Sequence, residues 1–275
     1  MILRIFGWFL ALSLGGQRDN LEPTDRLVPP GYKGNPWGPA ATLARKEGTL
    51  PPIAMTPKMA QWDKWGRAVL KDGDIVFRRG DAYILLGKFP FSRWLANASG
   101  SPFSHTGIVA IEDDAPVVYD TTHSSVRRQP FHIWILDNVG AVGVKRLKDA
   151  QKSHIPNVLA FCRKLFVDQP PFDFELSLDD TAYYCLEMTE KAFRAASLTL
   201  SQPIRVGDME NAGRYPIAIL MFQTITPWVL QKGLTTETEI FLPGNENHGI
   251  WASPLLDTVY PAGPLPPIQL PGKKN

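Results

Sequence analysis

The chain has 275 residues, enough for one folded domain of roughly 150–200 residues with flanking segments. Hydrophobic residues make up 44% of it and charged residues 20%, a globular composition that excludes global disorder. Its 29 basic and 27 acidic residues nearly cancel, and no run of five basic residues occurs. We therefore expect no nucleic-acid partner, and membrane association is not indicated by charge.

The N-terminus carries a short apolar stretch after Arg4. It is shorter than the ~20 residues that a membrane-spanning helix needs. It has the form of a signal-peptide hydrophobic region, with Ala11–Ser13 as a small-x-small cleavage site. We expect residues 1–16 to be a signal peptide or short apolar segment and the protein to be exported, to the periplasm or outside the cell. An uncleaved segment that anchors the chain in a membrane is the alternative.

Proline-rich stretches flank the central part of the chain. Residues 17–57 contain Val28–Gly31 and Thr49–Ile53, which are typical of an extended linker or of a strap over a domain. Residues 261–275 are similarly proline-rich and are expected to form a tail. The folded domain should therefore span 58–260.

Within that domain the pattern predicts alternating helices and short strands. Met59, Trp62 and Trp65 recur at helical spacing and predict a helix over 58–70. Further helices are expected near 90–98, 153–167, 181–197 and 215–230. Strands are expected at 73–77, 103–111, 116–121 and 142–147, the middle two forming a hairpin around Glu112–Ala115. This combination predicts an α+β fold, a small and mainly antiparallel sheet packed against helices.

The two cysteines occupy different sequence environments. Cys162 shares a helical apolar face with Val158 and Leu165, which is typical of a core residue. Cys185 follows Ser177–Asp180, whose side chains favour a helix N-cap, and should lie in the first turn of a helix. The free N–H groups and the dipole there favour a thiolate and can stabilise an oxyanion. From these residues alone, a nucleophile, a buried structural cysteine and a disulfide with Cys162 all remain open.

The hairpin places a histidine near a carboxylate. If Ile111 pairs with Pro116, then Asp120 faces Gly107, and His105 is its diagonal neighbour on the same face of the sheet. Such neighbours have Cβ atoms about 7 Å apart, within reach of a hydrogen bond between long side chains. The same alternation turns His123 to the opposite face. His105 and Asp120 therefore have the spacing of a base and its orienting group.

Four segments occur in an order that resembles the permuted NlpC/P60 superfamily, and within it the YiiX/YaeF-like group of papain-like hydrolases. They are Gly73–Phe77, Phe103–Val109, Val118–Asp120, and Pro171–Phe174 running into Tyr183–Met188. The resemblance covers about residues 70–200. It implies a permuted papain-like fold with Cys185 as nucleophile, His105 as base and Asp120 as orienting residue.

The chain departs from the pattern of that family at two positions. Leu186 stands where serine is usual, and Asp120 stands where glutamate is common, so that contact with His105 requires a closer approach or a water. Tyr184 is a weaker candidate for contact with substrate, and packing in the core is its alternative role.

The expected function is that of a cysteine hydrolase of the amidase or peptidase type. Its substrate would be a small molecule, a peptide or an acylated amine, and no cofactor is expected. A non-catalytic binding module on the same fold and a lipid acyl hydrolase or transferase are the alternatives. No metal is expected, because a zinc site made of Cys185, His105 and Asp120 would need His123 as well. A serine hydrolase is disfavoured because the chain has no Gly-x-Ser-x-Gly motif.

Overall fold

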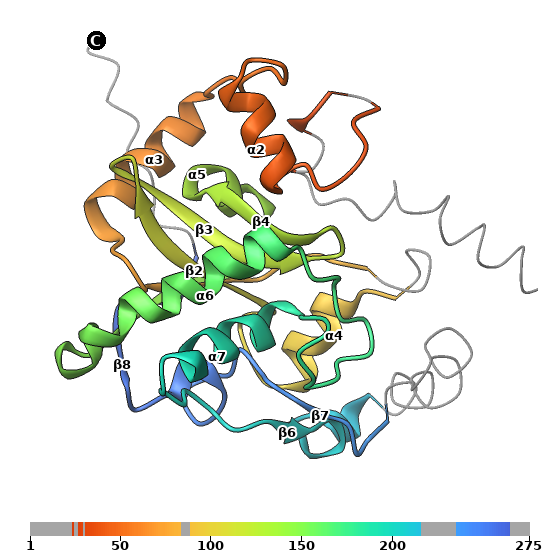
Figure 1. The fold of residues 1–275 in the computed structure, drawn as a ribbon. Coiled ribbons are helices and arrows are strands. Elements are labelled where there is room, and N and C mark those ends of the chain that lie inside the picture. The colour runs from red at the N-terminus through yellow and green to blue at the C-terminus, as the bar shows by residue number, and fades with distance from the viewer. Residues whose placement is uncertain (1–23, 25–26, 30, 84–88, 216–234, 265–275) are drawn as a thin grey trace, which may run out of the picture.

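A six-stranded antiparallel sheet forms the centre of the molecule (Figure 1). The computed structural model describes residues 24, 27–29, 31–83, 89–215 and 235–264. The strands follow the order β4-β3-β2-β1-β5-β8 across the sheet. Their bounds are β1 Ile75–Arg78, β2 His105–Glu112, β3 Ala115–Thr122, β4 Ser125–Pro130, β5 Val142–Leu147 and β8 Leu256–Gly263, and a separate pair consists of β6 Ile204–Arg205 and β7 Glu239–Ile240. The α+β architecture expected from the sequence is therefore observed.

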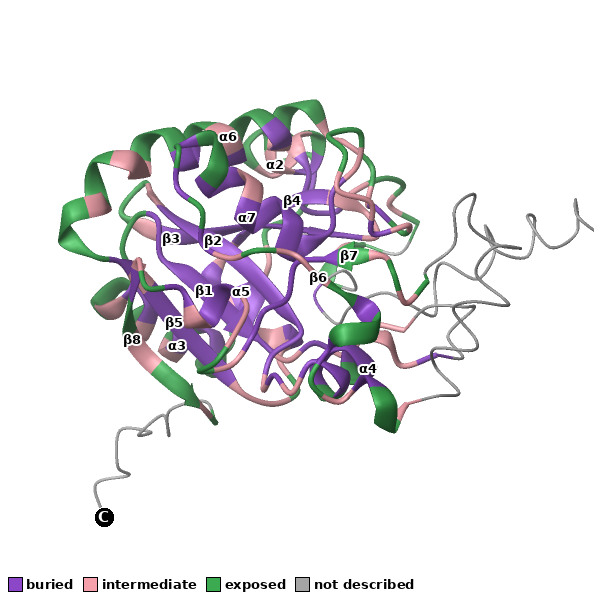
Figure 2. Cartoon of the chain, turned by 90° about the horizontal axis from the view of Figure 1, so that it is seen from below, coloured by how far each residue is buried: buried purple, intermediate pink, exposed green. Residues whose placement is uncertain are grey.

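Helices cover both faces of the sheet. Two α-helices, α3 (Pro57–Val69) and α5 (Phe131–Trp134), lie over one face, and α6 (Ile155–Asp168) and α7 (Cys185–Ala195) lie over the other (Figure 1). The remaining helical segments are α2 Pro39–Lys46, α4 Phe91–Ala98, η3 Ile135–Asp137, η4 Asp149–His154, η5 Val206–Asp208, η6 Ala212–Arg214 and η7 Ile250–Ala252. Because both faces are covered, most of the sheet is buried (Figure 2).

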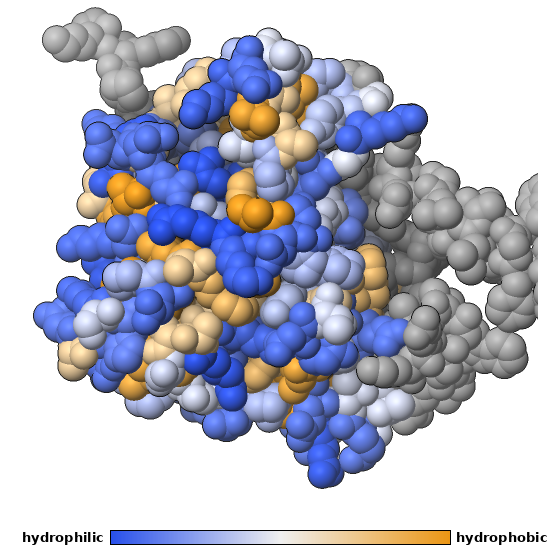
Figure 3. Space-filling model, in the orientation of Figure 1, coloured by the Kyte–Doolittle hydropathy of each residue, from blue (hydrophilic) through white to orange (hydrophobic). Residues whose placement is uncertain are grey.

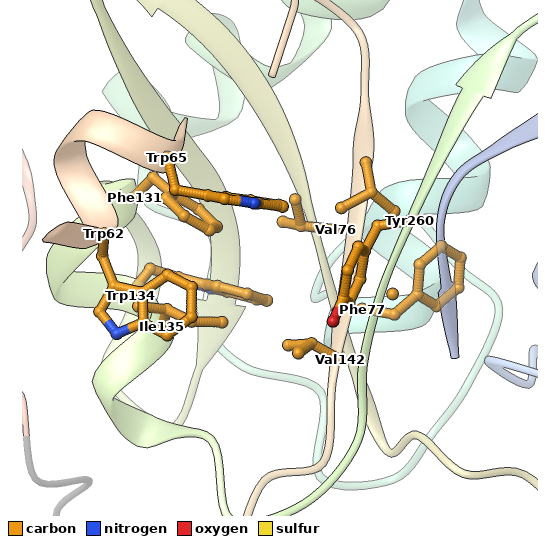
Figure 4. A pocket seen from close by; sticks show the side chains of 11 residues that line it. Trp62, Trp65, Val76, Phe77, Phe131, Trp134, Ile135, Val142 and Tyr260 are labelled. Atoms are coloured by element: carbon orange, nitrogen blue, oxygen red, sulfur yellow. The ribbon is translucent and has the colours of Figure 1, made fainter. Parts of the chain in front are cut away.

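Side-chain alternation along the strands gives each face its own apolar core. Val76, Val109 and Val118 point toward α3 and α5, where they meet a layer of aromatic rings. Ile75 and Ile108 point the other way and join the larger core that includes α6 and α7. In the aromatic layer Phe131 stacks between Trp65 and Trp134, with ring centroids 5.6 and 6.5 Å apart, and the three side chains line an apolar crevice (Figure 4). Trp134 is thereby held firmly against the sheet.

The hairpin has the register that the sequence predicts. Ile111 pairs with Pro116, and the pairing continues through Val109 with Val118. The turn consists of Asp113 and Asp114, both with positive φ, as the tight hairpin turns require. Beyond the predicted end of the hairpin, β3 extends to Thr122 and turns into β4, an unpredicted strand that lies opposite Asp120.

The proline-rich segment before residue 58 is more structured than an extended linker. It includes α2, and Trp37 is buried in a small cluster with Met59 and Ile133. At the other end β8 pairs with β5 as far as Gly263, so ordered structure passes the expected start of the tail at 261. The expected signal segment at 1–16 and the helix expected at 215–230 lie outside the described residues, apart from Tyr215 itself.

The surface that carries α6 mixes small hydrophobic patches with hydrophilic side chains (Figure 3). Among the residues that the structure describes, no helix has both the length and the apolar character needed to cross a membrane.

Cys162 is fully buried in the larger core, and its burial raises the pKa of its thiol to about 12. Both cysteines are free, so the disulfide left open by the sequence is absent. We expect Cys162→Ala to lower the free energy of unfolding by about 1 kcal/mol through a small cavity, measured by urea denaturation. In a Cys185→Ala background, Cys162 should resist iodoacetamide at neutral pH until the protein is unfolded. Rapid labelling of the native protein would contradict this placement.

Candidate active site

Cys185 is the first residue of α7, which begins later than the sequence predicted. Its N-cap is Tyr184, whose backbone N–H donates to Glu187 at 3.3 Å. The polar residues taken for the N-cap belong instead to the preceding loop, where Asp179 accepts from the backbone N–H of Thr181. Cys185 therefore lies closer to the helix terminus than predicted. There the backbone N–H groups of the first turn have no partner within the helix.

Two threonines fix the start of α7 against β2. The hydroxyl of Thr106, next to His105 on β2, bonds that of Thr189 at 2.9 Å. Both hydroxyls also lie within hydrogen-bond distance of the backbone carbonyl oxygen of Cys185, at 3.4 Å from Thr106 and 3.1 Å from Thr189, so that one hydroxyl donates to the other and the second donates to this carbonyl. The backbone of Cys185 is thus tied to the strand that carries His105. Cys185 is 9% exposed, whereas Cys162 is fully buried.

The buried His105 lies in direct contact with Asp120. Its Nε2 is 2.7 Å from Asp120 Oδ2, so the shorter aspartate reaches the ring without an intervening water. Gly107, opposite Asp120, keeps this part of the hairpin tight, because a Cβ there would lie 2.4 Å from Val118 Cγ1. Since Nε2 is occupied by Asp120, Nδ1 is the ring nitrogen left for Cys185.

Asp120 accepts hydrogen bonds from further side chains that were not predicted from the sequence. Arg127, directly opposite on β4, donates to Oδ1 from Nε at 3.0 Å and to Oδ2 from Nη2 at 2.6 Å. Trp134 donates from Nε1 to Oδ2 at 2.8 Å. With Arg78, which pairs with His105 across β1 and β2, these residues form a buried charge row across four strands.

A second carboxylate balances the charge row. Asp137 Oδ2 lies 3.0 Å from Arg78 Nη1 and 3.9 Å from Arg127 Nη1. Thr24, from the proline-rich N-terminal segment, donates to Asp137 through its backbone N–H at 2.9 Å and its hydroxyl at 2.7 Å. Two arginines thus face two aspartates. This balance matters because an unpaired buried charge is strongly destabilising.

The charges of the site set the pKa values of its two titrating residues. Burial alone would lower the pKa of His105, and Arg78 acts in the same direction. The charge of Cys185 and hydrogen bonds to Asp120 and Cys185 outweigh both and raise that pKa to about 9. Burial would raise the pKa of Asp120, but Arg127 and His105 hold it well below its ordinary value. Asp120 therefore stays ionised beside an imidazole that favours its protonated form.

Tyr184 lies beside the cysteine in an apolar pocket, and its hydroxyl accepts a 2.6 Å hydrogen bond from the backbone N–H of Phe241. This bond ties the Tyr184 hydroxyl to the backbone at the end of β7. His123 lies in the turn between β3 and β4 rather than on a strand, so the alternation argument does not apply to it. Its ring bonds the hydroxyl of Ser124 at 3.2 Å.

Comparison with known proteins identifies the fold and the family. A family model described as the permuted papain-like amidase enzymes YaeF/YiiX, family C92, matches residues 69–225, more than half of the chain. The chain belongs to this family. The uncharacterised protein YiiX of Escherichia coli K12 is 24% identical over 194 residues, which span 70% of this chain and 87% of YiiX. Membership in this family supports a hydrolase function of the amidase type.

The crystal structure of YiiX from Escherichia coli O157:H7 is similar to this fold with a TM-score of 0.54 and 20% identity, covering 70% of this chain and 98% of that one. That protein is described as a metalloprotein. Across the described part of the present chain, no three His, Cys, Asp or Glu side chains converge as a metal site would require. Both oxygens of Asp120 are already taken by Arg127, with Trp134 and His105 sharing one of them. The residues described here therefore do not fit a metal.

The elevated pKa of His105 can be tested directly. Because the charge of Cys185 is the largest influence that raises it, Cys185→Ala should lower the pKa of His105 from about 9 by at least about one unit, leaving burial and Arg78 to dominate. The titration would be followed by NMR of the imidazole, assigned with His105→Gln. His132, which bonds Asp63, is the internal control and should titrate unchanged. An unchanged pKa of His105 would refute its coupling to Cys185.

The bidentate grip of Arg127 on Asp120 gives a second prediction. Arg127→Lys keeps the charge but loses the fork, which should lower the free energy of unfolding by about 1.5–3 kcal/mol. Arg128→Lys is a matched control, because the neighbouring Arg128 pairs with the half-buried Glu112 and should cost under about 1 kcal/mol. Chemical denaturation of both variants provides the measurement. Equal losses in the free energy of unfolding would mean that the buried Arg127–Asp120 contact stabilises the protein no more than the Arg128–Glu112 pair does.

Proposed function

We propose that the protein is a cysteine amidase in which Cys185 is the nucleophile, His105 the base and acid, and Asp120 the orienting group. The observation that carries the proposal is the 2.7 Å contact between buried Asp120 and His105, beside a cysteine at the first position of a helix. Family membership supports the amidase class. The proposed substrates are amides or acyl compounds.

The proposed nucleophile is the thiolate of Cys185 beside a protonated His105, whose pKa is raised to about 9. In the proposed reaction, Cys185 Sγ attacks the carbonyl carbon and forms a C–S bond, and the electron pair of the C=O bond moves onto oxygen. Collapse of this intermediate breaks the C–N bond, and His105 gives its proton to the departing nitrogen. His105 then takes a proton from a water molecule, whose oxygen adds to the thioester carbonyl; collapse breaks the C–S bond, releases the carboxylic acid and restores the thiolate of Cys185 beside protonated His105.

The start of α7 suits the negative charge that develops on the carbonyl oxygen. The backbone N–H groups in its first turn have no partner within the helix and lie close to Cys185, the first residue of that turn. The positive end of the helix dipole acts in the same direction. Asp120 stabilises the imidazolium without being protonated, since its pKa is held low.

A non-catalytic binding module would not need a cysteine at the start of a helix beside the His105–Asp120 pair. A lipid acyl hydrolase or transferase remains the second candidate function, and the observation that favours it is the apolar pocket beside Cys185. These two enzyme classes share the same acyl-thioester intermediate, so one set of variants tests both.

Removing the thiol tests the mechanism. Cys185→Ala should lower turnover on any substrate by at least roughly a thousandfold while the fold is kept, measured with a panel of acyl esters and peptide anilides. Cys162→Ala is the matched control and should retain turnover, because Cys162 lies in the core. His105→Ala should be nearly as damaging, and Asp120→Asn less so. Near wild-type turnover in Cys185→Ala would sink the proposal.

A further inference from the structure

A small pocket, with a cavity volume of about 30 Å³, opens beside Cys185. It is lined by Phe91, Leu95, Ser104, Phe172, Leu176, Tyr184, Cys185, Leu186, Ile240 and Phe241. Among the described residues that line the pocket, only Cys185 and Tyr184 carry ionisable side chains. Burial raises the pKa of Tyr184 well above its ordinary value. The hydroxyl of Ser104 accepts from the backbone N–H of Gly80 at 3.0 Å.

One wall of the pocket is held in an unfavourable backbone conformation. Leu176 has a φ of 52°, in the left-handed region that bulky residues rarely adopt, and yet its side chain is buried. The Asp173 carboxylate holds the loop on both sides of it, accepting from the backbone N–H of Glu175 at 2.8 Å and from the hydroxyl of Ser177 at 3.1 Å. Strain of this kind is kept where a side chain must point in a required direction.

Apolar surface continues outward from the pocket. The ring of Phe172, in the lining, contacts Phe174 edge to face with centroids 4.9 Å apart. The side chain of Phe174 is 50% exposed, which is unusual for a large aromatic residue. A substrate that reaches Cys185 along this side passes over apolar groups.

We propose that this pocket binds an uncharged, apolar acyl group, the part of the substrate that becomes bonded to Cys185 Sγ. The proposal rests on the proposed function and deepens it by naming the substrate class. Since Cys185 is itself part of the lining, a group attached to the carbonyl carbon has direct access to the pocket. A carboxylate or ammonium group placed there would lose its water without gaining a partner from the lining, so charged acyl groups should be excluded.

The test uses p-nitrophenyl esters, in which the leaving group is constant and only the acyl group varies. We expect kcat/KM for hexanoate to exceed that for acetate by at least tenfold, since each buried methylene contributes about fourfold. The mono-p-nitrophenyl ester of adipic acid, which has a terminal carboxylate on a chain of the same length, should react at least tenfold more slowly than the hexanoate. The p-nitrophenyl esters of N-blocked leucine and glycine test whether the group bound in the pocket is a peptide side chain or a linear acyl chain.

Leu176 permits variants that keep the backbone unstrained. Leu176→Gly adopts the left-handed conformation freely and enlarges the pocket, so the preferred chain should lengthen beyond hexanoate. Leu176→Asn also tolerates that conformation but places an amide in the wall, so the hexanoate-to-acetate ratio should fall. Ser197→Gly is the matched control, because Ser197 has a φ of 63° and lies outside the pocket lining. It should leave the chain-length profile unchanged.

The outcomes separate this proposal from the proposed function. A flat chain-length profile, with ester hydrolysis that depends on Cys185, would overturn the acyl pocket and leave the cysteine mechanism intact. A profile that responds to Leu176 variants as described would support the pocket. Hydrolysis that persists unchanged in Cys185→Ala would instead overturn the mechanism on which the pocket depends.

Discussion

The buried carboxylate of Asp120 is the constraint on which the rest of the site depends. A carboxylate removed from water is stable only when its oxygens are satisfied by charged or polar donors. Here the donors come from β2, β4 and α5, so these elements must meet at one point on the sheet. The aromatic layer that holds Trp134, the second hairpin that supplies Arg127, and the position of His105 all serve this one requirement.

The two faces of the sheet have different physical roles. The face beneath α3 and α5 carries the charge row, and the other face is the larger apolar core to which α7 belongs. Cys185 lies where these environments meet. His105 lies on one side of it and the apolar walls of the pocket lie on the other.

How much the sequence reveals depends on how local each interaction is. The β2–β3 hairpin is a short-range structure, and its register follows from the apolar alternation and the two-residue turn, so the contact of His105 with Asp120 was predictable. Arg127 was not predicted, because a fully buried arginine is rare and its partner became apparent only with β4 in place. The adjacent pair Arg127–Arg128 did contain a signal. Neighbouring strand residues face opposite sides of the sheet, so the two arginines had to point to different faces.

The start of α7 was misplaced for a similar reason. Ser177 and Asp179 are good N-cap residues by type, but a loop also uses such side chains to bond its own backbone. Asp173 and Asp179 do so here, which delays the helix until Cys185. Local preference cannot distinguish these two uses, because the choice depends on how α7 docks against Thr106 on β2.

The hydrogen bonds between Thr24 and Asp137 tie the N-terminal segment to the charge row. These residues are 113 positions apart, yet both oxygens of Asp137 accept hydrogen bonds from Thr24. Trimming that removes Thr24 would expose one end of the charge row to solvent and leave Asp137 to bond water instead. The part of the proline-rich segment that includes Thr24 therefore belongs to the folded structure rather than to a spacer.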